Sequence, residues 1–237
     1  MTEGAITGPN EKNEKESITN NILITLEQFA HFNMLLHKKL EDFNLILASA
    51  SPRRRQLLAD CGLQFTLAKK FECDEYYPAT MPCGEVAEYL SQLKSNAYPN
   101  PLQSNDILLT ADTVVIADGK ILGKPADRDE ALSMLRMLSA RKHTVITGVT
   151  LRTAERVHSF SVASDVIFRH ITDEEIAYYV DTYKPFDKAG AYGIQEWIGY
   201  VAIEGIEGSF FNVMGLPVQR LYVELGAFVD ADLQNCK

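Results

Sequence analysis

The stretch from residue 45 to residue 58 constrains the fold more than any other part of the chain. An apolar run at 45–49 leads through a Ser-x-Ser-Pro turn into a segment that opens with three arginines. Ser51 is a suitable N-cap and Pro52 a suitable first helical residue, so the pattern predicts a buried strand, a tight turn and a helix over 52–61.

The three arginines lie where a helix disfavours cations, because the N-terminus of a helix carries a partial positive charge. They therefore suggest a compensating anion. A strand followed by a tight turn and free backbone N–H groups is a ready phosphate site. A basic first turn that is simply solvated is the alternative explanation.

The rest of the chain alternates between strand and helix patterns, which is typical of an α/β protein. A helical periodicity at 22–40 predicts a helix that packs on the body, or alternatively an arm that binds a partner. The other expected strands are 64–68, 107–117, 143–153 and 157–169; the other expected helices are 84–96, 127–138, 172–182 and 216–225.

Composition excludes several classes of function. The chain has 237 residues, 46% of them hydrophobic, which is enough for one core or for one core split into two lobes. The net charge of −9 disfavours a nucleic-acid polymer or an anionic membrane as partner. No apolar run approaches the roughly 20 residues of a membrane span. Four cysteines without metal spacing indicate reduced thiols and a cytoplasmic location.

A second constellation surrounds the turn at 118–119, an Asp-Gly pair that is a strong hairpin signal. If Ala117 faces Lys120, extending the register places Thr113 opposite Lys124 and Asp112 opposite residue 125. A carboxylate beside an ammonium suits phosphoryl chemistry, since the acid can orient water or hold a metal and the cation neutralises phosphate. A structural salt bridge is the alternative.

Weaker signals lie elsewhere. The segment 187–195 reads Asp-Lys-Ala-Gly-Ala-Tyr-Gly-Ile-Gln, whose small residues would let the backbone approach a ligand. Lys188 adds a cation there, and Gln195 offers an amide suited to a base edge. The histidines at 143, 158 and 170 have neighbours that indicate structural roles.

These blocks together resemble the Maf (septum-formation) family of nucleoside triphosphate pyrophosphatases over about residues 44–226. The blocks are Leu-Ala-Ser-Ala-Ser-Pro-Arg-Arg at 47–54, Ala-Asp-Thr-Val-Val at 111–115, Leu-Gly-Lys-Pro at 122–125, the 187–195 segment, Ile-Glu-Gly-Ser at 206–209 and Asn-Val-Met-Gly-Leu-Pro at 212–217.

The resemblance implies a twisted mixed sheet flanked by helices, in two lobes around a cleft, as in inosine triphosphatase. It implies a hydrolase acting on acid anhydrides that cuts a nucleoside triphosphate between the α- and β-phosphates with Mg²⁺ or Mn²⁺. Members are often homodimers. Residues 1–33 fall outside the family pattern and are expected to be a partly disordered extension, with 34–230 forming the domain.

The resemblance also assigns roles. It implies that Asp112 accepts the proton of the attacking water, and that Asp112 and Glu75 hold the metal. Arginine, threonine and glutamine at three selector positions are typical of the branch that prefers dTTP and UTP. Glu196 departs from the family pattern, in which glycine often follows Gln195. This departure is expected to affect none of the assigned roles. The substrate-binding positions are Ser49, Arg54, Glu75, Lys94, Lys124 and Lys188, and the selector positions are Arg53, Thr113 and Gln195.

The sequence therefore predicts a cytoplasmic, house-cleaning pyrophosphatase for dTTP, UTP and modified pyrimidine nucleotides. Two alternatives stay open at this point. One is hydrolysis of 7-methyl-GTP by the same chemistry. The other is a nucleotide-binding regulator of cell division that works through protein contacts.

Overall fold

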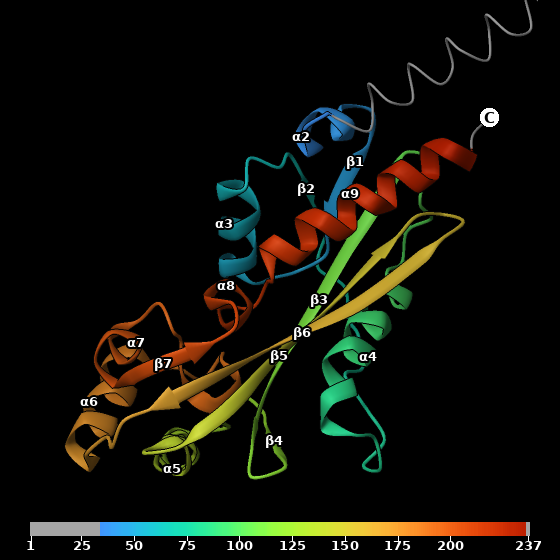
Figure 1. Ribbon diagram of the computed structural model, residues 1–237. Helices are drawn as coiled ribbons and strands as arrows, with labels where there is room; N and C mark the ends of the chain where they lie inside the picture. Colours follow the sequence, from blue (N-terminus) through green and yellow to red (C-terminus); the bar gives the residue numbers. More distant parts are fainter. Residues whose placement is uncertain (1–33, 236–237) are drawn as a thin grey trace, which may run out of the picture.

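A strongly twisted mixed sheet runs through the centre of the molecule (Figure 1). The computed structural model describes residues 34–235, and within them the sheet has seven strands in the order β2-β1-β3-β5-β6-β7, with β4 paired to β3. The first three lie parallel and the others antiparallel. The strands are β1 (Asn44–Leu47), β2 (Thr66–Leu67), β3 (Asp106–Ala117), β4 (Lys120–Leu122), β5 (Lys142–Arg152), β6 (Val157–Phe168) and β7 (Ile203–Glu207).

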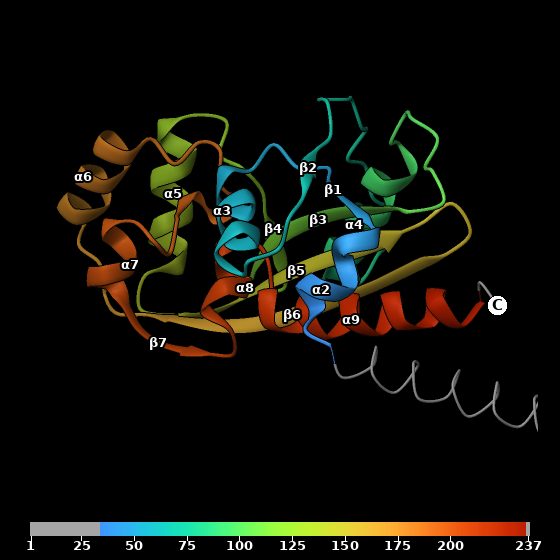
Figure 2. The same ribbon diagram turned by 90° about the horizontal axis from the view of Figure 1, so that it is seen from above.

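Helices cover both faces of this sheet. Figure 2 shows α4 on one side of β3, β5 and β6 and α9 on the other. The helices are α2 (Leu36–Lys39), α3 (Pro52–Asp60), α4 (Cys83–Asn96), α5 (Arg128–Leu138), α6 (Asp173–Tyr183), α7 (Trp197–Ala202), α8 (Phe210–Met214) and α9 (Val218–Asn235), with 3-10 turns η1 (Leu40–Asp42) and η2 (Ala189–Ala191). None of these helices is both long and apolar enough to cross a membrane.

Two apolar cores divide the molecule into two lobes. One packs α5, α6 and α7 around residues such as Val115 and Val145. The other packs α2, α3 and α9 around residues such as Leu109 and Val149. In Figure 1 these two helix groups lie toward opposite ends of the long strands, with β3 and β5 passing between them. The predicted mixed sheet with flanking helices and two lobes is confirmed.

The predicted helix starts are found with one adjustment. Thr172 and Glu175 form a reciprocal capping box at α6. The Asp127 carboxylate accepts from the backbone N–H of Glu130 at the start of α5. The Glu130 carboxylate, however, accepts from Ala126, one residue before the N-cap, so the capping box at α5 is only half formed.

The hairpin at 118–119 has the predicted register but is shorter than predicted. Val115 pairs with Leu122, and Ala117 with Lys120, after which β4 ends. The chain leaves β3 at Gly123, whose carbonyl accepts a hydrogen bond from the N–H of Gly190. The predicted pairings of Lys124 with Thr113 and of residue 125 with Asp112 are therefore wrong. On their other side, Thr113 and Asp112 pair with Thr147 and Gly148 of β5.

Two other boundaries differ from the predictions. The strand expected at 64–68 is only two residues long, and the helix expected to end at 225 continues to residue 235. Buried Leu221, Leu225, Phe228 and Val229 give α9 its apolar stripe. Of the helix expected at 22–40, residues 22–33 lie outside the described part of the chain.

Candidate functional site

A cleft of about 1030 Å³ opens between the lobes where one edge of β3 has no strand beside it. Along β3, pairing with the parallel partner β1 stops at Leu109, and pairing with β4 covers only residues 115–117. All ten residues that the sequence assigned to a site line this cleft: Ser49, Arg53, Arg54, Glu75, Lys94, Asp112, Thr113, Lys124, Lys188 and Gln195.

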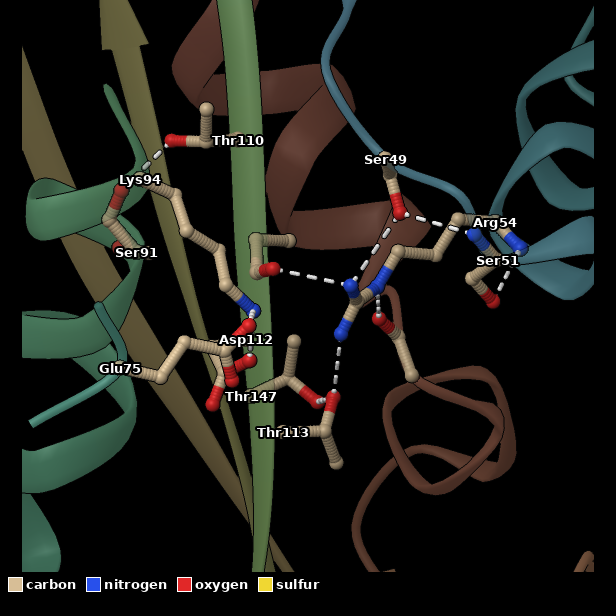
Figure 3. A network of polar contacts seen from close by, with 12 residues as sticks. Ser49, Ser51, Arg54, Glu75, Ser91, Lys94, Thr110, Asp112, Thr113 and Thr147 are labelled. Carbon is tan, nitrogen blue, oxygen red and sulfur yellow. Dashed lines mark hydrogen bonds and ion pairs between the residues drawn. The ribbon is translucent and has the colours of Figure 1, made fainter. Parts of the chain in front are cut away.

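Alternation along β3 sends its polar side chains to two sides of the cleft. Successive residues of a strand point to opposite faces, so Asp112 points toward α4 and Thr113 toward α3 and α8. On the α4 side, the Lys94 ammonium forms ion pairs with Asp112 and, at 3.1 Å, with Glu75 (Figure 3). Lys94, and not Lys124 as the register argument predicted, is the cation against Asp112.

Arg54 occupies the gap in the edge of β3. Its guanidinium donates to the carbonyl oxygens of Gly215 at 2.7 Å and Ala111 at 2.9 Å. It also donates to the hydroxyls of Thr113 at 3.0 Å and Ser49 at 3.3 Å (Figure 3). Burial lowers the pKa of Arg54, although a guanidinium keeps its charge in proteins. Most of its donors are thus used by the protein, and its charge faces the cleft.

A chain of hydroxyl groups continues from Arg54 into the sheet. Thr113 and Thr147 lie 2.9 Å apart at their hydroxyl oxygens, and Thr147 donates to the carbonyl of Asn212 at 3.0 Å. Because the proton of Thr147 goes to Asn212, the proton of Thr113 must go to Thr147, while Thr113 accepts from Arg54. The Thr113 hydroxyl therefore has no proton left for a ligand in this arrangement.

The far wall of the cleft is the segment 187–196. The Lys188 ammonium is largely buried and contacts the carboxylates of Asp187 at 2.6 Å and Glu196 at 3.1 Å. Arg53 reaches the same Asp187 at 3.5 Å. Glu196, which was expected to play no part in the assigned roles, folds its side chain back onto the assigned Lys188.

Gln195 also faces this wall. Its side-chain oxygen is buried and has no hydrogen-bond partner among the described residues. A buried acceptor without a partner is costly, so its presence in a cleft points to a donor on a ligand.

Other cleft residues were missed by sequence reasoning. Lys69 and Lys70 follow β2 and line the cleft. The sequence could have indicated these two lysines, because ligands bind outside the carboxyl ends of parallel strands. Lys69 and Lys70 follow β2 just as Ser49 follows its parallel neighbour β1. Thr147 and Asn212 carried no such signal. Lys124 is exposed, and no side-chain partner for it occurs within the part of the chain that the structure covers.

The histidines at 143, 158 and 170 are not among the residues that line the cleft. His143 is buried against Tyr192, with 2.8 Å between the ring nitrogen and the hydroxyl. His158 lies 2.7 Å from Glu224 of α9. These contacts agree with the structural roles expected for them.

Comparison with known proteins places the chain in a defined group. The family model described as Maf-like protein matches residues 44–228. A protein of Bacteroides thetaiotaomicron named dTTP/UTP pyrophosphatase is 51% identical over 186 residues, covering 78% of this chain and 96% of that protein. A Porphyromonas gingivalis protein of the same name is 49% identical over 195 residues, covering 81% and 98%.

More distant comparisons add less. A Flavobacterium psychrophilum protein, also named dTTP/UTP pyrophosphatase, is 44% identical over 191 residues, covering 81% of this chain and 97% of that protein. Among solved structures, a nucleoside-triphosphatase / dITP/XTP pyrophosphatase of Mycobacterium abscessus covers 80% of this chain and 98% of its own, at 14% identity and a TM-score of 0.37. Those two values are too low to carry an argument.

Proposed function

The chain belongs to the Maf family, and on that premise we propose that it hydrolyses dTTP and UTP to the nucleoside monophosphate and pyrophosphate. The observation that carries the proposal is the convergence in a single cleft of the Asp112 and Glu75 carboxylates with cations from both lobes. Such a cleft suits a polyanion in a protein whose net charge is −9, because the positive charges are concentrated where they are needed.

The cations divide into two groups by their freedom to meet a ligand. Lys124, Lys69 and Lys70 are exposed and can turn toward phosphate oxygens. Arg54 and Lys188 are held by protein acceptors and present a fixed charge. Together they would neutralise the triphosphate and the charge that develops on the leaving pyrophosphate.

Asp112 is the proposed proton acceptor. In the reaction a water oxygen bonds to the α-phosphorus, the bond from that phosphorus to the bridging oxygen breaks, and pyrophosphate leaves. The proton released by the water passes to the Asp112 carboxylate, which lies in the cleft with its side chain 13% exposed. Its sequence neighbours Ala111 and Thr113 both accept hydrogen bonds from Arg54, so the backbone on each side of Asp112 is held in place.

The oxygen donors Asp112 and Glu75 fit a divalent cation. Mg²⁺ and Mn²⁺ prefer carboxylate oxygen, and Mg²⁺ is usually bound by one or two carboxylates plus substrate phosphates. Both carboxylates contact the same ammonium, Lys94, which shows that their oxygens converge on one positive charge. When bound there, Mg²⁺ or Mn²⁺ would polarise the phosphate oxygens.

The base preference is argued from Gln195. Thymine and uracil carry an N–H donor at position 3, whereas cytosine has an acceptor there. The partnerless side-chain oxygen of Gln195 supports recognition of that donor. We therefore propose that Gln195 selects uracil and thymine, and that Arg53, which reaches Asp187 of the same segment, supports this wall, whereas Thr113 supports Arg54.

The test is product analysis. Purified protein would be incubated with Mg²⁺ and, separately, with dTTP, UTP, CTP, GTP or 7-methyl-GTP, and pyrophosphate would be scored against orthophosphate. Pyrophosphate with thymidine or uridine monophosphate is the expected result. Preferred cleavage of 7-methyl-GTP would overturn the base assignment. Release of orthophosphate would overturn the choice of bond, and no turnover would favour a nucleotide-binding regulator.

We further propose that the enzyme acts in the cytoplasm as a homodimer, without a membrane or a nucleic-acid polymer as partner. The acidic isoelectric point of about 5.1 supports the exclusion of polyanionic partners. Sedimentation at micromolar concentration measures the oligomeric state, and a monomer there would refute the dimer.

A further inference from the structure

Tyr179 of α6 connects the helical lobe to the far wall of the cleft. The Tyr179 side chain is fully buried, and its hydroxyl donates to the Glu196 carboxylate. The same hydroxyl accepts a hydrogen bond of 3.0 Å from the backbone N–H of Gly193. Burial and the contact with Glu196 both raise the pKa of Tyr179, so the hydroxyl keeps its proton and continues to donate.

Glu196 uses its two oxygens for different partners. One accepts from Tyr179, and the other lies 3.1 Å from the Lys188 ammonium. The side chains of Glu196 and Lys188 are 19% and 9% exposed, so solvent screens this ion pair weakly. The contacts of Lys188 with Asp187 and Glu196 take up two of its three N–H groups, which leaves one for a phosphate oxygen.

The backbone of the segment is adapted to this arrangement. A Cβ atom at Gly193 would lie 2.9 Å from the carboxyl carbon of Glu196 and 3.1 Å from the side-chain nitrogen of Gln195. The N–H of Glu196 also bonds the carbonyl of Gly193 at 3.0 Å. The turn that carries Gln195 is therefore closed around the Glu196 side chain.

We infer that Tyr179 and Glu196 are positioning residues that fix the Lys188 ammonium in the cleft. This inference deepens the proposed function and rests on it for the identity of the substrate. It assigns a role to a buried tyrosine outside the cleft lining and to a glutamate that departs from the family pattern. Glu196 thus acts through Lys188 and touches no reacting atom.

The inference opposes a simpler electrostatic expectation. If Glu196 were only a negative charge near an anion site, Glu196→Gln would strengthen phosphate binding. A positioning role predicts the reverse. Misplacing a cation by about 1 Å can cost up to about 100-fold in rate, and we expect Glu196→Gln to lower kcat/KM for dTTP about tenfold.

A double-mutant cycle with Lys188→Met tests whether Glu196 acts through Lys188. In the Lys188→Met background, Glu196→Gln should change kcat/KM by less than about twofold, because the group it positions is gone. An equal loss in both backgrounds, or a gain in the wild-type background, would overturn the inference. Tyr179→Phe provides a second route should Glu196→Gln not fold, with the same dependence on Lys188 expected.

Tyr183→Phe is the matched control. Tyr183 lies on the same helix and stacks on Tyr179 with ring centroids 5.2 Å apart, but its side chain is 36% exposed and lies outside the cleft lining. Activity of this variant should equal that of the wild type.

The same double-mutant cycle can be measured on binding alone, as the affinity of each variant for inorganic tripolyphosphate by calorimetry. If no nucleotide is hydrolysed, the proposed function fails, while the tripolyphosphate cycle still decides the role of Glu196.

Discussion

The Arg54 guanidinium donates a 2.9 Å hydrogen bond to the carbonyl oxygen of Ala111, at the place on β3 where the partner strand β1 has already ended. Two residues earlier on the same edge, the carbonyl of Leu109 accepts instead from the backbone N–H of Ala48. Arg54 thus continues the hydrogen bonding of the sheet with a side chain, directly beside Asp112. This explains why an arginine is tolerated in the first turn of α3.

Arg54→Lys should lower the stability of the protein as well as its catalytic activity. The planar guanidinium donates to Gly215, Ala111 and Thr113 at once, which a lysine ammonium cannot do. Buried acceptors would therefore lose their donors. We expect a loss of about 3 kcal/mol, or about 10 °C in the unfolding temperature. Circular dichroism melts measure it. Arg55→Lys in the same helix is the control and should melt within about 1 °C of the wild type.

Asp112→Asn should separate binding from catalysis. The amide cannot accept the proton of the attacking water, so kcat should fall about 1000-fold. Binding of dTTP should persist, because the phosphate-facing cations are unchanged; calorimetry would show this. Asp118→Asn, on the exposed turn of the same hairpin, should keep full activity. Retained turnover in Asp112→Asn would remove this residue from the role of base.

Lys94 and Lys124 should differ in what their loss affects. Lys94→Met leaves the carboxylates of Asp112 and Glu75 without their shared cation, and we expect the unfolding temperature to fall by about 5 °C. Lys124→Met removes an exposed cation of the cleft, so kcat/KM should fall about tenfold with the melting temperature unchanged. Equal melting temperatures for the two variants would contradict the Lys94 bridge.

The sequence was sufficient where local chemistry decides the structure. Ser51, Pro52 and the preceding apolar run specify β1, the turn and α3, and all three occur where predicted. The hairpin register at 118–119 also followed from its two turn residues. All ten predicted site residues share one cleft, which forms where β1 ends and leaves the middle of β3 without a neighbouring strand.

Long-range geometry was not available in the same way. The register could not show that β4 stops at Leu122 and that the next residue bonds instead to Gly190, far along the chain. The roles of Thr147 and Glu196 depend on which strand lies beside β3 and how a loop folds back. The length of α9 was a different failure, since its apolar stripe continues visibly to Val229.

His143 should make stability depend on pH. Burial lowers its pKa from 6.5 to about 4. Between these values the unfolded chain binds a proton that the folded protein does not, so the free energy of unfolding falls as pH decreases from 6.5 to 4, by up to about 3 kcal/mol. Denaturant titrations of wild type and His143→Gln measure it, and the variant should show a flatter profile. His170→Gln, at an exposed position, should behave as the wild type.

Thr147→Val should imitate Thr113→Val if Thr113 acts through Arg54. Thr113 accepts from Arg54 and is bonded to Thr147, so either change breaks the same chain of hydroxyls. We expect each variant to lose about fivefold in kcat/KM for dTTP and UTP alike, with the ratio of dTTP to CTP unchanged within about twofold. Steady-state kinetics on the three nucleotides measure this.

The control for that comparison is Thr150→Val in the same strand. Thr150 is buried and bonded to Ser91 and Ser159, so its loss carries a similar stability cost of about 1 kcal/mol but lies away from Arg54. Activity should therefore survive in Thr150→Val and fall in Thr147→Val. A shift in the dTTP to CTP ratio in Thr113→Val alone would show instead that Thr113 contacts the base directly, because a residue that only supports Arg54 affects every triphosphate equally.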